Sequence, residues 1–167
     1  LLGFGASGTA LTIFPALGRK DPQRGLGLLG LATGFSILGA YLLTDKLPFD
    51  SFSIAWDRRQ VGILVLHYIA LSTPFFFSGM AIGLLLDVHP NSAGGTYAIN
   101  LLGSALGCIV ALLAPPFLGA EGTVSLSSGL AVLGALISLK NGGTLTSKRG
   151  RGLIASALLL LIFLCLD

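Results

Sequence analysis

Charged residues are scarce in this chain of 167 residues: 10% are Asp, Glu, Lys or Arg, while 53% are apolar and the mean hydropathy is +0.89. A soluble domain averages about 25% charged residues, so the chain has too little charge for a surface that faces water. Intrinsic disorder is excluded as well, because it requires low hydrophobicity and high charge. The net charge of +3 rests on too few groups to indicate a nucleic-acid surface, so we expect no nucleic-acid partner.

Cysteine is equally rare. Cys108 and Cys165 both lie in apolar runs, and the sequence has no CxxC motif and no Cys/His cluster. This excludes a disulfide framework and a metal site of that type. No Ser-His-Asp set, phosphate-binding loop or pair of catalytic carboxylates can be assembled either. We therefore predict no catalytic residue, no metal and no cofactor in this chain.

Long uncharged apolar runs dominate what remains. They indicate membrane helices, because lipid offers no partner for unpaired backbone groups. The core of a large soluble protein is disfavoured, because the loops supply too little polar surface. The sequence predicts an all-α integral membrane bundle, a single domain over residues 1–167 with about six transmembrane helices. The expected spans are 1–17, 25–44, 61–86, 96–118, 123–139 and 152–166.

The chain starts inside one apolar run and stops inside another, so we expect it to be a fragment of a longer protein. Its Lys and Arg residues predict an orientation. Loops one, three and five together carry seven of them, and loops two and four carry three. This places loops one, three and five on the cytoplasmic side of a multi-pass protein, with the cell (inner) membrane as the expected location.

Glycine is abundant, with 24 residues in 167, roughly twice the ordinary usage of about 7%. Three GxxxG motifs predict close helix packing, because small residues four apart let helix backbones approach in lipid. The glycines concerned are Gly30, Gly34, Gly79, Gly83, Gly103 and Gly107. Pro74 should kink the third span, and Pro115 with Pro116 should end or break the fourth.

The segment 49–60 combines charges with aromatic residues. Asp57, Arg58 and Arg59 follow Trp56, a residue type that favours the membrane interface. We interpret this segment as an interfacial anchor, with a polar site for an anionic group as the alternative. Both arginines lie on the side with fewer cations, which suggests a specific partner such as Asp50 or Asp57.

Three further polar residues lie within the expected spans: His67, Tyr97 and Asn100. We interpret His67 as a neutral histidine that donates one hydrogen bond to a neighbouring helix. The alternative is a contact with a proton or substrate, the usual role of an intramembrane ionisable group. Tyr97 and Asn100 share a helical stripe with Ser104 and are candidates for a contact that lines a pore.

Gly3, Gly5 and Gly8 match the GxGxxG pattern. A dinucleotide site needs a strand before this pattern and an acidic residue about 20 positions after it. No strand precedes the glycines, and Asp21 lies in a charged turn. Helix packing is therefore the preferred interpretation.

Four segments together carry a family resemblance: GFGASGT at 3–9, LPFDSFSIAWDRRQ at 47–60, PFFFSGMAIG at 74–83 and YAINLLGSALGC at 97–108. They resemble the membrane region of bacterial spermidine synthase-like proteins, in which a major-facilitator-like domain is fused to a soluble aminopropyltransferase-like domain. The resemblance covers roughly residues 1–140. The glycine-rich cofactor loop and catalytic aspartates of the soluble domain are absent from this sequence, so no catalytic residue is carried over.

The resemblance implies a membrane domain that anchors a soluble transferase-like domain of the same parent chain and supplies it with substrate. The expected partners are the lipid bilayer and that soluble domain. The alternative function is a membrane transporter, or half of one, for a small polar or charged solute, which Pro74, His67 and the Arg58/Arg59 pair would serve. A third possibility is a purely structural anchor.

Overall fold

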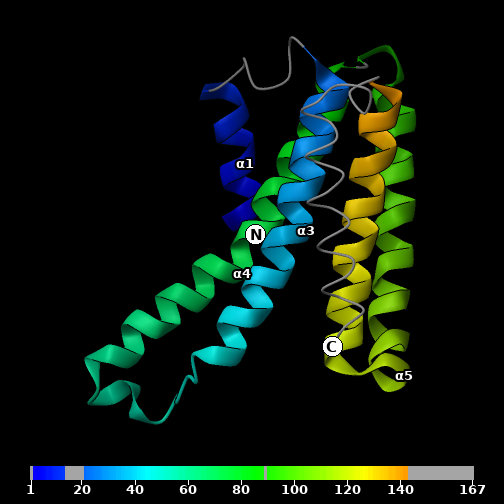
Figure 1. Cartoon of the computed structure of the whole chain (residues 1–167). Helices are drawn as coiled ribbons and strands as arrows, with labels where there is room; N and C mark the ends of the chain where they lie inside the picture. Colours follow the sequence, from blue (N-terminus) through cyan, green and yellow to red (C-terminus); the bar gives the residue numbers. More distant parts are fainter. Residues whose placement is uncertain (1, 14–20, 89, 143–167) are drawn as a thin grey trace.

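The computed structural model describes residues 2–13, 21–88 and 90–142, and all the regular structure within these ranges is helical (Figure 1). This confirms the all-α class. The long elements are α1 (Leu2–Ile13), α3 (Pro22–Lys46), α4 (Arg58–Val88) and α5 (Ala93–Asn141). The 3-10 turns η1 (Ser53–Ala55) and η2 (Pro90–Ser92) precede α4 and α5.

Three helices are long and apolar enough to cross a membrane: α3, α4 and the run Pro90–Asn141. Each exceeds the roughly 20 residues that a crossing requires. The expected count of about six spans is not confirmed. Helix α1 covers part of the expected span 1–17, and the expected span 152–166 lies outside the described residues.

Helix α5 is two antiparallel arms that meet at Gly119. Figure 1 shows the first arm descending and the second returning toward the opposite end. Gly119 has φ 70° and ψ −178°, a combination that only glycine adopts readily. Neither Pro115 nor Pro116 breaks the helix, which continues through both, and the break falls directly after the expected span 96–118. The chain reverses three residues later, where glycine provides the backbone freedom that a reversal needs.

Helix α3 lies between α4 and the second arm of α5, and its glycines allow the close approach. A Cβ atom on Gly30 would come within 2.9 Å of the Ala135 Cβ, and one on Gly34 within 2.9 Å of the Val132 Cγ2. Leu31, Val132, Ala135 and Leu139 form the buried cluster at this interface. Small residues thus bring two backbones together, as the GxxxG pattern at Gly30 and Gly34 predicts.

Two serines add hydrogen bonds across the same interface. The fully buried Ser128 hydroxyl donates to the Gly34 carbonyl oxygen at 3.0 Å. Toward the other end, the Ser138 hydroxyl lies 2.9 Å from the Gln23 carbonyl oxygen and 3.0 Å from its side-chain oxygen. Hydrogen bonds between membrane helices contribute about 0.6–2 kcal/mol each. They fix the register of α3 against α5.

Helix α1 packs on α4 through small residues from both helices. Cβ atoms on Gly79 and Gly83 would overlap Ser7 and Leu11 of α1, and one on Gly3 would overlap the α4 backbone near Ser72. The GxGxxG segment therefore contributes to a helix interface through Gly3, while Gly5 and Gly8 have open space around them.

The third GxxxG motif, Gly103 to Gly107, contacts no other helix of the described residues. Nothing lies within 4 Å of a Cβ placed on Gly103 or Gly107, and residues 101–113 of the first α5 arm are all exposed. No contact among the described residues supports the packing expected at Gly103 and Gly107, which stays a prediction.

Pro74 lies inside α4, where its ring removes the N–H that would bond to the Ala70 carbonyl oxygen. The hydroxyls of Ser72 and Thr73 both donate to the Ile69 carbonyl oxygen, at 3.0 and 2.7 Å. Such bonds from serine and threonine favour bending. Figure 1 shows α4 beside α3 in its upper half and leaning away from it below, which leaves much of residues 61–71 exposed.

The chain connections gather at two ends of the molecule. The α3–α4 connection and the reversal at Gly119 lie at the lower end of Figure 1, and the start of α3, η2 and the end of α5 lie at the upper end. At the lower end, the Tyr41 hydroxyl donates to the Glu121 Oε1 at 3.2 Å. The described parts of loops one, three and five thus lie at one end and loops two and four at the other, which is the division that the Lys and Arg count assumes.

Candidate functional site

The α3–α4 connection, which the sequence singles out, is a compact hydrogen-bonded turn. The Asp50 carboxylate accepts hydrogen bonds from the Phe52 N–H at 3.0 Å and from the Ser53 hydroxyl. The Asp50 N–H donates to the Gln60 Oε1 at 3.2 Å. Asp50 therefore organises η1 and ties it to the start of α4.

The pKa of the Asp50 carboxyl lies below its ordinary value, chiefly because the Ser53 hydroxyl donates to its charged form and the Phe52 N–H adds a second bond. A lowered folded-state pKa means that ionised Asp50 stabilises this turn above the unfolded-state pKa. The contribution is lost as pH falls through the folded-state pKa.

We therefore expect the turn to loosen only at a pH below the ordinary aspartate pKa of about 3.9, as the pH falls through the lowered pKa of Asp50. Trp56, the only tryptophan of the chain, ends η1 and reports the change by its fluorescence. Asp50→Asn should abolish this acid transition, and Ser53→Ala should move it to higher pH. An unchanged transition in Asp50→Asn would show that another group controls the turn.

Asp57 directly precedes α4, and its carboxylate accepts a hydrogen bond from the Arg59 N–H at 2.9 Å. This is the contact of a helix N-cap. The ion pair suggested between the arginines and Asp50 or Asp57 was wrong: in the described part of the chain, the only ion pair joins Asp45 and Lys46. Both carboxylates are instead engaged by backbone N–H groups, and both arginines remain exposed.

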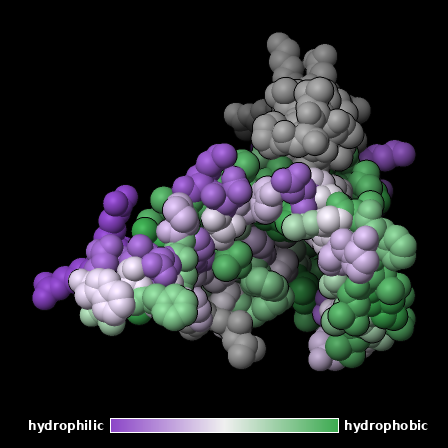
Figure 2. Space-filling view, turned by 90° about the horizontal axis from the view of Figure 1, so that it is seen from below, coloured by the Kyte–Doolittle hydropathy of each residue, from purple (hydrophilic) through white to green (hydrophobic). Residues whose placement is uncertain are grey.

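Aromatic side chains project from the same turn. Phe52 is 83% exposed and Trp56 77% exposed. Figure 2 shows hydrophilic side chains gathered over this end of α3 and α4, whereas α5 presents a largely hydrophobic surface. Exposed aromatics beside arginines are the arrangement of an interfacial anchor.

His67 lies about two and a half turns into α4. Its Nδ1 is 2.8 Å from the Ile63 carbonyl oxygen. Because a carbonyl oxygen can only accept, Nδ1 carries the proton in this contact. The expected donation to a neighbouring helix was wrong in its partner, since Ile63 belongs to the same helix. The Phe49 ring lies beside the imidazole, with 6.2 Å between ring centroids.

Tyr97 and Asn100 lie near the start of α5. Tyr97 is 53% exposed, and the Asn100 carbonyl oxygen accepts a hydrogen bond from the Ser104 hydroxyl at 2.9 Å. This end of α5 is the upper end in Figure 1, whereas Arg58 and Arg59 lie at the lower end. Helix α4, with 31 residues, separates the two groups by roughly 45 Å at 1.5 Å per residue. The structure therefore does not bring the six candidate residues into one site.

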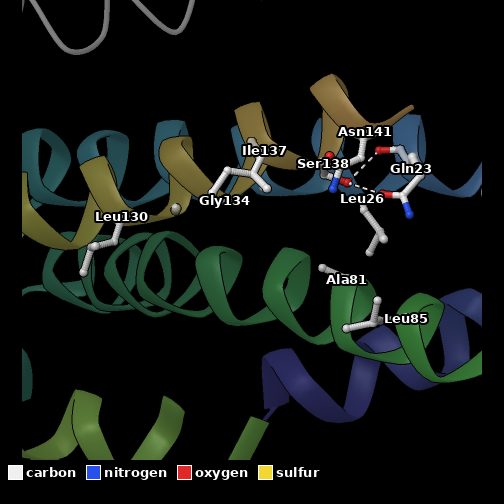
Figure 3. A pocket seen from close by; sticks show the side chains of 12 residues that line it. Gln23, Leu26, Ala81, Leu85, Leu130, Gly134, Ile137, Ser138 and Asn141 are labelled. Atoms are coloured by element: carbon white, nitrogen blue, oxygen red, sulfur yellow. Dashed lines mark hydrogen bonds between the residues drawn. The ribbon is translucent and has the colours of Figure 1, made fainter. Parts of the chain in front are cut away.

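A polar cluster that the sequence does not indicate lies at the upper end of the α3–α5 interface. Gln23, Ser138 and Asn141 lie together there and form one end of an open groove (Figure 3). Each was assigned to a loop or to the edge of a span. Each of the two helices has polar residues at its end, which the sequence shows. Only the packing of α3 against α5 brings these residues together.

We searched for metal-binding groups and for similar proteins. Within the described ranges, no group of three or more His, Cys, Asp or Glu residues could hold a metal ion. No family model, no curated protein and no solved structure matches this chain.

Proposed function

We propose that this chain is a multi-pass domain of about six spans in a bacterial inner membrane, which anchors a spermidine synthase-like soluble domain. The observation that supports a scaffolding role is the chemistry of the packed interior. The buried polar side chains of the described residues are Ser7 and Ser128, and each donates to a backbone carbonyl oxygen. Charged groups inside a membrane protein usually mark paths for ions or protons, and this interior is built from small and apolar residues.

The anchored domain is proposed from the resemblance of four segments to spermidine synthase-like membrane regions. In the structure, segment 3–9 packs on segment 74–83: a Cβ atom on Gly79 would overlap Ser7 and Phe4, and one on Gly3 would lie 2.9 Å from the Phe75 Cβ. Segment 47–60 forms the interfacial turn. Two of the resembling segments thus build one helix interface, which is consistent with a framework rather than a moving part.

The test uses the natural polypeptide. An antibody against residues 47–57 should detect it in the membrane fraction after carbonate washing, with a mass well above the 17.1 kDa of this chain. Membranes enriched in it should catalyse aminopropyl transfer to a polyamine acceptor. A mass close to that of this chain, or a soluble polypeptide, would contradict the proposal.

One observation favours the alternative of a transporter for a small polar or charged solute. His67 is half-buried in the part of α4 that leans away from α3, on the lower side of Pro74. We expect proteoliposomes of the chain to take up polyamines and organic anions no faster than empty vesicles, and His67→Ala and Arg58→Ala to change nothing. Uptake that both substitutions abolish would establish transport instead.

A further inference from the structure

An open groove of about 370 Å³ runs between α4 and the second arm of α5 and is floored by α3. Figure 3 shows Leu130, Gly134 and Ile137 on the α5 side and Ala81 and Leu85 on the α4 side. The walls along its length are apolar. The volume is near the lower end of the roughly 300–1,000 Å³ of ligand pockets.

The length of the groove matches one leaflet of a bilayer. Its α5 wall extends from Leu130 to Asn141, about 16 Å at 1.5 Å per residue. The hydrocarbon core of a bilayer is about 30 Å thick, so the groove covers roughly half of it. It ends where α5 ends and α3 begins, and the ends of spanning helices are expected near the polar headgroups.

Polar groups lie at that end. Because the Ser138 hydroxyl contacts both oxygens of Gln23, at 2.9 and 3.0 Å, the Gln23 side-chain oxygen is held toward α5. The amide N–H groups of Gln23 and Asn141 are then donors available at the mouth. Arg24 and Lys140 are the cations next to them in the chain, and Asp21 and Asp87 are the acids of the same end.

We propose that the groove binds one acyl chain of a phospholipid from the surrounding bilayer, with the phosphate and ester oxygens at Gln23 and Asn141. An apolar channel one leaflet long with donors at one end fits such an amphiphile. The proposal does not depend on the anchored transferase.

Gly134 provides the test. It lines the groove, and nothing lies within 4 Å of a Cβ placed there, so Gly134→Leu fills the groove without displacing a neighbour. Gly107→Leu is the matched control, because Gly107 also has open space but lies outside the groove. The probe is a phosphatidylglycerol with a photoreactive group in mid-chain, reconstituted with the whole chain. Labelled peptides are quantified by mass spectrometry.

We expect labelling of residues 130–141 to fall about tenfold in Gly134→Leu, since about two methylene groups lose their contacts. Gly107→Leu should label as the unmodified chain does. Ala81→Leu, on the opposite wall, should act like Gly134→Leu and provides a second variant. Gln23→Leu should reduce labelling less. Equal labelling of residues 130–141 in Gly134→Leu and Gly107→Leu would overturn the proposal.

Discussion

Replacing Gly34 by leucine should lower the free energy of unfolding by about 2–4 kcal/mol. A Cβ at Gly34 would lie 2.9 Å from the Val132 Cγ2 and 3.3 Å from the Ser128 carbonyl oxygen. The second neighbour is backbone, so it cannot rotate away. Overpacking costs about 1–3 kcal/mol, and separating the helices also breaks the buried bond from Ser128 to Gly34, worth about 1 kcal/mol. Unfolding by SDS in mixed micelles, followed by circular dichroism, measures the loss.

Gly103→Leu is the matched control, because it makes the same change in a GxxxG motif with open space around it. It should be neutral or slightly stabilising, by up to about 0.8 kcal/mol, because leucine favours a helix interior over glycine. Equal losses in the two variants would mean that α5 packs through Gly103 on a surface absent from the described bundle, and that the α3–α5 interface is not distinctive.

The second large effect is expected at the reversal of α5. Gly119→Ala should destabilise the bundle by about 1–3 kcal/mol, because φ 70° with ψ −178° is strained for any residue with a Cβ. No neighbour lies within 4 Å of such a Cβ, so the cost is conformational rather than steric crowding. The same SDS titration in mixed micelles measures this loss of unfolding free energy, and chemical crosslinking between the two arms of α5 should weaken with it.

Gly39→Ala serves as the control, because it should raise the free energy of unfolding rather than lower it. Gly39 lies inside α3 with nothing within 4 Å of its Cβ position. Alanine in a helix interior is favoured over glycine by about 0.5–1 kcal/mol, so this variant should be slightly more stable. If Gly119→Ala also proves neutral or stabilising, the reversal at Gly119 is not the conformation of the folded chain.

In the α3–α4 connection, local sequence indicates the segment but not the hydrogen-bond partners of its side chains. Asp50, Asp57 and Arg59 lie within ten residues of one another, and the sequence correctly selected their segment as a distinct unit. It did not predict that the carboxylates bond to backbone N–H groups, because the turn η1 and the first turn of α4 decide which donor lies nearest. His67 is similar, since its depth follows from its position in the run but its partner Ile63 follows from a side-chain rotamer.

By itself, the sequence determined the all-helical class and the presence of long apolar helices, because lipid permits only backbone that bonds within its own segment. It also determined that small residues would mediate packing. Only the tertiary structure decided which GxxxG motifs find a partner: Gly34 faces Val132 and Ser128, whereas Gly103 faces open space. The same four-residue spacing creates a smooth face in both cases. Whether another helix lies against it depends on chain reversals such as that at Gly119, which are set by one backbone conformation far from the face itself.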